Sequence, residues 1–77
     1  MLYTDLELFE EILNNIESIE TAINTYKKLP DDNLLQIVIK LHYRNKKFTI
    51  KAIENAAANG KFKVVHEAKH VSIMLVH

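Results

Sequence analysis

Apolar residues recur at alternating spacings of three and four along the first third of the chain, as they do in an amphipathic helix. This series, widened by two neighbouring leucines, consists of Leu6, Phe9, Ile12, Leu13, Ile16, Ile19, Ile23 and Tyr26. Thr4 and Glu7 have the spacing of a capping box, in which each side chain satisfies an orphaned backbone N–H at a helix start. We therefore expect one helix over about residues 4–29.

Proline separates this helix from the next, because Pro30 lacks a backbone N–H and disfavours helical geometry in the residue before it. It also suits the start of a second helix, where Asp31 and Asp32 place negative charge near the positive end of the helix dipole. So short a connection favours an antiparallel αα-hairpin.

The second helix is expected over about residues 31–59, followed by Gly60, the chain's one glycine. The stretch 45–48 leaves an alternative open, in which the helix breaks there and Thr49 caps a separate helix. We favour the continuous helix.

A shorter third helix is expected over about residues 62–76. The inner face of this helix consists of Val64, Ala68, Val71 and Leu75. The predicted fold is therefore all-α, with an antiparallel αα-hairpin and a shorter C-terminal helix in one domain, 1–77. We expect a three- or four-helix bundle that dimerisation completes.

Dimerisation is expected because the second predicted helix is apolar on two sides and needs two neighbours. One side faces the first helix, and the other would form an exposed stripe, which soluble monomers rarely tolerate. We predict that two copies of the chain bury this stripe, or that another protein binds it. The stripe consists of Leu35, Ile39, Tyr43, Ile50 and Ile53.

Composition supports a small helical protein and limits the chemistry available to it. The 77 residues are 48% apolar and include one glycine, one proline and no cysteine, so disulfides and thiolate metal sites are excluded. No internal repeat is visible. No signal peptide is recognisable, and no apolar run approaches the ~18 residues that span a bilayer, so we expect a cytoplasmic location.

Charge is distributed unevenly, although the net charge is zero. Residues 1–33 hold eight acids against two lysines, and residues 34–77 hold two acids against eight bases, which gives −6 and +6. Either the two halves pair with each other, or the basic half meets an acidic partner or phosphates. The candidate contacts for such a partner are Lys40, Arg44, Lys47, Lys51, Lys61 and Lys63.

One catalytic motif is present by sequence, since residues 66–70 match H-E-x-x-H, in which two histidines bind zinc and a glutamate activates water. We reject a metalloprotease, because the third histidine of the metzincin pattern would fall at Val76 and so short a chain can hardly build a substrate cleft. The sequence offers no phosphate-binding loop and no nucleophile with an acid–base relay. We predict no metal, no cofactor and no enzymatic activity.

Binding functions remain. The leading hypothesis is a small regulator, inhibitor or adaptor that binds another protein. One alternative is a nucleic-acid-binding regulator that uses the basic residues. Ala56 and Gly60 do resemble the turn of a helix-turn-helix, but Lys61 and Lys63 stand where that motif has buried apolar residues. A small immunity-type protein at a membrane surface is the other alternative.

Overall fold

The computed structural model describes the backbone of residues 5–76 and the side chains of residues 7–71. Within that part of the chain there are helices and no strands, so the all-α prediction is confirmed. The helices are α1 (Asp5–Asn15), α2 (Ile19–Thr25), α3 (Asp31–Tyr43), α4 (Ile50–Ala58) and α5 (Phe62–Val76). The third predicted helix, 62–76, corresponds to α5.

The single helix predicted over residues 4–29 is wrong, because the chain leaves helical geometry between α1 and α2. Ser18 is extended (φ −150°), and its hydroxyl accepts a hydrogen bond of 3.0 Å from the backbone N–H of Thr21. Serine competes in this way with the helical backbone and starts a new helix as its N-cap. The predicted capping residue Thr4 lies outside the described residues.

Continuity of the second predicted helix is also wrong, and the alternative with a break is confirmed. Asn45 is left-handed (φ 68°), and its N–H bonds to the carbonyl of His42 while the N–H of Lys46 bonds to that of Leu41. This pair of bonds is the Schellman motif that ends helices. The Thr49 hydroxyl then caps α4 by accepting from the N–H of Ala52 at 3.1 Å.

Two other boundaries agree with the sequence. Pro30 is the N-cap of α3, with Asp31 and Asp32 in the first turn. Gly60 ends α4 at φ 69° in the same hydrogen-bond pattern as Asn45, which a glycine adopts without steric cost.

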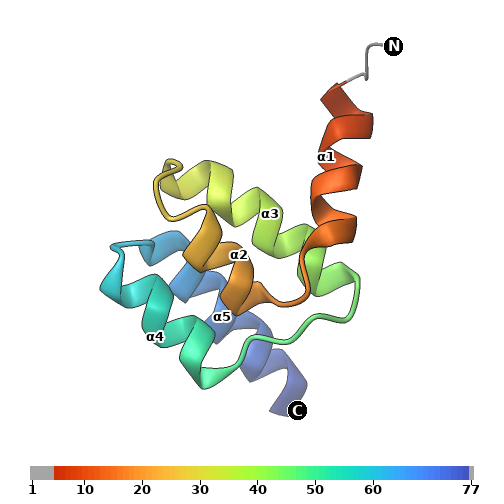
Figure 1. Ribbon diagram of the computed structural model, residues 1–77. Helices are drawn as coiled ribbons and strands as arrows, with labels where there is room; N and C mark the ends of the chain where they lie inside the picture. Colours follow the sequence, from red (N-terminus) through yellow and green to blue (C-terminus); the bar gives the residue numbers. More distant parts are fainter. Residues whose placement is uncertain (1–4, 77) are drawn as a thin grey trace.

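Four of the helices form a bundle of two stacked hairpins. In the first hairpin α2 packs against α3, in the second α4 packs against α5, and the hairpins stack with α2 on α4 and α3 on α5. In Figure 1, α2 and α4 run in one direction and α3 and α5 run back. Within the described residues, α3 and α4 make no contact and lie diagonally opposite. The core between the helices contains Leu13, Ile19, Ile23, Leu34, Leu41 and Val64.

The two hairpins share part of their burial pattern, although Ile19 and Ile37 are buried and the residues 30 positions later, Thr49 and Glu67, are not. Each first helix begins at a hydroxyl N-cap, Ser18 or Thr49. Buried residues recur 30 positions apart (22 to 52, 34 to 64, 38 to 68), as Ala22 and Ala52, Leu34 and Val64, and Val38 and Ala68.

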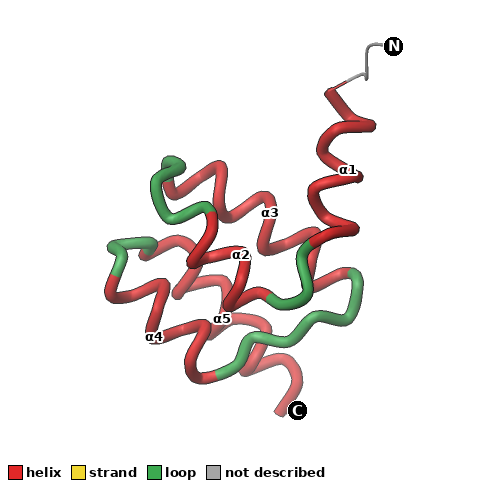
Figure 2. The backbone as a smooth tube through the Cα atoms, viewed as in Figure 1, coloured by secondary structure: helices red, strands yellow, loops and turns green. Residues whose placement is uncertain are grey.

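Helix α1 stands apart from the two hairpins. Of the described helices it packs against α3 alone, and its first turns extend past the bundle, which gives the molecule its longest dimension of 45 Å (Figure 1 and Figure 2). Leu13 and Ile16 are buried, whereas Leu8 is 49% exposed. Helix α1 is therefore anchored at its C-terminal end and leaves part of its apolar face uncovered.

Candidate functional site

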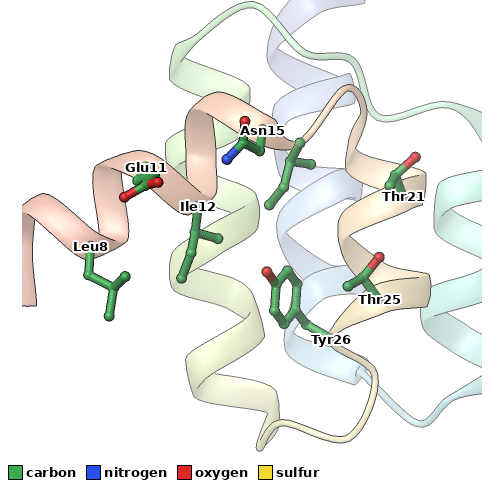
Figure 3. Close-up of a pocket in the computed structure, with 8 residues that line it drawn as sticks. Leu8, Glu11, Ile12, Asn15, Thr21, Thr25 and Tyr26 are labelled. Atoms are coloured by element: carbon green, nitrogen blue, oxygen red, sulfur yellow. The ribbon is translucent and has the colours of Figure 1, made fainter.

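The apolar surface that α1 leaves open forms one wall of a groove. Helices α1 and α2 diverge from the break at residues 16–18 and enclose a volume of about 470 Å³ (Figure 3). Leu8 and Ile12 of α1 line one wall, Tyr26 at the end of α2 lines the other, and Ile16 lies where the walls meet. Figure 3 shows the Tyr26 ring directed toward Ile12, with α3 running behind them.

Polar groups at the edge of the groove are mostly neutral. Asn15 comes from α1, and Thr21 and Thr25 come from α2. The one charged side chain in the lining is that of Glu11, which is exposed. The groove can therefore bury apolar side chains of a ligand and offers a carboxylate and neutral hydrogen-bonding groups around them.

A polar contact links α1 to the C-terminal end of α3, in addition to the burial of Leu13 and Ile16. The Arg44 guanidinium, at the C-terminal cap of α3, pairs with the Glu10 carboxylate and donates to the side-chain oxygen of Asn14. Charge-assisted contacts of guanidinium groups have restricted geometry, so this clamp orients α1 as well as holding it. Arg44, predicted to contact phosphate or an acidic partner, is thus engaged within the chain.

Two more of the six predicted basic contacts join the hairpins. Lys61 is only 9% exposed, and its Nζ donates to the carbonyl of Leu29 at 2.6 Å. The backbone N–H of Lys63 donates to Asp31 Oδ2 at 2.9 Å, and its Nζ pairs with Asp32. The side-chain hydrogen bond between Lys63 and Asp32, and then the charge of Asp32, raise the pKa of the Lys63 ammonium. These contacts hold the two hairpin loops together.

The remaining three predicted basic contacts are Lys40, Lys47 and Lys51. All three are exposed and make no ion pair within the described part of the chain. They are distributed over α3, the connection and α4, so no single helix carries all three. The break at Asn45 is the reason.

The predicted apolar stripe is divided by the same break. Leu35, Ile39 and Tyr43 belong to α3, whereas Ile50 and Ile53 belong to α4, and these two helices do not pack together. Tyr43 and Ile50 are 77% and 75% exposed, and the other three are partly buried. The expectation of one continuous stripe is wrong, and its role in binding stays a prediction. The side chain of Leu75, assigned to the inner face of the third predicted helix, lies outside those described.

The H-E-x-x-H residues lie on α5, with His66 and His70 exposed and Glu67 partly buried. No cluster of three or more histidine, aspartate or glutamate side chains within residues 7–71 could hold a metal ion. Among the described helices, none combines the length and apolar character needed to cross a membrane.

Comparison with known proteins gives no relative for this chain. No family model, no curated protein and no solved structure matches it. Functional inference therefore depends on the geometry described above.

Sequence reasoning missed the groove because it assigned both walls to one straight helix. A local signal was present, since Ser18 precedes Thr21 at the spacing of an N-cap and its partner. Leu8 is a second signal, because it lies beside the main apolar series and has no assigned neighbour within that helix.

Proposed function

We propose that this chain is a non-enzymatic binding module, a regulator, inhibitor or adaptor that recognises another protein through the groove between α1 and α2. The observation that carries the proposal is the groove itself, an apolar cleft on an otherwise well-packed small domain. Protein-binding grooves of this kind take an amphipathic helix whose apolar side chains enter the cleft.

The arrangement of α1 also supports the proposal. A helix that extends from a bundle and is held at one end by an Arg44 clamp presents its free flank in a fixed direction. Preorganised surfaces bind with less loss of conformational entropy than mobile ones.

An affinity experiment with two matched variants tests this function. Leu8→Gln changes an exposed wall of the groove, and Ile50→Gln changes an exposed apolar residue elsewhere. Each chain is immobilised and exposed to a lysate of cells that express it, and captured proteins are identified by mass spectrometry. We expect the wild-type chain and Ile50→Gln to capture the same protein and Leu8→Gln to fail to capture it. Retention by all three chains would contradict a role for the groove.

Nucleic-acid binding is the second candidate, and the exposed, unpaired Lys40, Lys47 and Lys51 favour it. Three phosphate contacts on duplex DNA would give a slope of about −2.7 in log affinity against log salt, at about −0.9 per contact. Absence of binding to random DNA and RNA at low salt would eliminate this candidate.

Dimerisation through Tyr43 and Ile50 is a further proposal, supported by the exposure of both side chains. Sedimentation equilibrium tests it against the chain mass of 8.9 kDa. A dimer should return to the monomer mass in Ile50→Gln and persist in Leu8→Gln, and a wild-type monomer at high concentration would refute it.

A further inference from the structure

The stacked hairpins define a vacant position in the molecule. Helices α2, α3, α5 and α4 form a closed ring, in which each helix packs against two neighbours. Helix α1 begins a second ring on the other side of the first hairpin, because it packs on α3 and is drawn on the side away from α4 and α5 (Figure 1). That ring has α1, α3 and α2 as members and lacks a fourth.

The groove is the place of this missing helix. Its lining comes from α1 and α2, the two helices that a fourth member would contact (Figure 3). From Leu8 to Asn15 the α1 wall rises about 10 Å, so it meets about two turns of a helix lying along it. Two turns carry apolar side chains at i, i+3 or i+4 and i+7, which suffice to cover such a wall.

Charge determines what kind of helix fits. Residues 1–26, which include both walls, hold six acids and no lysine, arginine or histidine. Lys27 and Lys28 directly follow Tyr26 but are not part of the groove lining, and Arg44 is paired with Glu10. Glu11 is in the lining and makes no ion pair with any other described residue.

An acidic groove favours a basic helix. A second copy of α1 is not basic, because α1 carries four acids and no base, and like charges oppose association. We propose that the groove binds one amphipathic helix of a partner protein, with apolar side chains against Leu8, Ile12 and Tyr26 and with lysine or arginine beside Glu11. This proposal rests on the proposed function and specifies its partner.

Two synthetic probes test the charge preference. Both are fluorescein-labelled helices of about four turns (~15 residues) with the same leucine stripe, and one has lysines and the other glutamates at the flanking positions. Fluorescence anisotropy measures binding of each to the full chain. We expect the lysine probe to bind at least about tenfold more tightly than the glutamate probe.

Three variants locate the binding. Leu8→Gln should weaken the lysine probe about tenfold, because it removes apolar contact at an exposed position where the fold does not depend on it. Glu11→Lys should weaken the lysine probe about fivefold and strengthen the glutamate probe. Glu54→Lys, an equal change at an exposed position of α4, is the matched control and should alter neither affinity by more than about twofold. Circular dichroism melts establish that all three variants are folded.

The outcomes separate this proposal from the proposed function. Equal affinity for the two probes, or equal effects of Glu11→Lys and Glu54→Lys, would overturn the basic partner while leaving the groove as a protein-binding site. An unchanged affinity in Leu8→Gln would refute both. If the wild-type chain sediments as a dimer that Leu8→Gln dissociates, a second copy occupies the groove and the basic partner is overturned.

Discussion

Asn45 gives the sharpest test of the fold, because replacing it by glycine or alanine has opposite consequences in a broken and in a continuous helix. At its φ of 68°, an alanine is strained by about 1–2 kcal/mol, whereas glycine is not. Relative to alanine, glycine lowers the stability of the fold by about 0.5–1 kcal/mol, because it gives the unfolded chain more conformational freedom. Asn45→Gly should therefore be more stable than Asn45→Ala by about 1 kcal/mol.

A continuous helix over residues 31–59 would reverse that order, since glycine in a helix interior is about 1 kcal/mol worse than alanine. The difference in the free energy of unfolding between Asn45→Gly and Asn45→Ala therefore changes by about 2 kcal/mol between a broken and a continuous helix. Each kcal/mol corresponds to about 4–8 °C in the melting temperature of a domain of this size.

Thermal melts followed by circular dichroism provide the assay. We expect Asn45→Gly to melt about 4–8 °C above Asn45→Ala. Glu54, exposed within α4, supplies the internal control, and there the alanine variant should be the more stable of the pair. Alanine above glycine at position 45 as well would refute the break between α3 and α4.

Three further predictions follow from the described contacts. Ile23→Ala should lower the free energy of unfolding by about 2–5 kcal/mol, because Ile23 is fully buried. Its exposed neighbour serves as the control, and Asn24→Ala should change that free energy by less than about 0.5 kcal/mol. Urea unfolding measures both. In the same assay Lys61→Met should cost about 1–3 kcal/mol, since it removes the hydrogen bond to the Leu29 carbonyl, and a loss no larger than that of exposed Lys63→Met would contradict this. NMR titration should give Lys63 a pKa above its ordinary value. The pairing of Lys63 with Asp32 therefore stabilises the fold fully below the ordinary pKa, and this stabilisation is lost as the pH rises through the raised pKa of the folded state. In Asp32→Asn the raised pKa should disappear.

Much of the fold could be predicted from apolar periodicity and from strong helix boundaries. Pro30 fixes its own φ and has no backbone N–H, whereas Gly60 adopts a φ of 69° without steric cost, and both boundaries were predicted. Ser18 and Asn45 act differently, because serine and asparagine also occur inside helices and their effect depends on which hydrogen bonds the tertiary structure leaves open. The residue types alone therefore do not predict either break.

The candidate site was less predictable, because it arises from one of those breaks. Ile12 and Tyr26, from opposite walls of the groove, were assigned to one apolar series, and the bend at Ser18 separates them, whereas Leu8 was not assigned to that series. The basic residues show the converse error. They are conspicuous in sequence, but Arg44, Lys61 and Lys63 serve contacts with residues about 30 positions away along the chain (10 to 44, 29 to 61, 32 to 63), which a helical pattern does not reveal.

Protein binding in the groove between α1 and α2 is most directly tested by mapping amide chemical shifts of the ¹⁵N-labelled chain during titration with the lysine-flanked helix. We predict that the largest changes occur over residues 8–16 and 21–26, which form the two walls. Residues 47–51, which carry exposed cations and Ile50, should change little. Changes centred on residues 47–51, or no changes at saturating probe, would contradict the account.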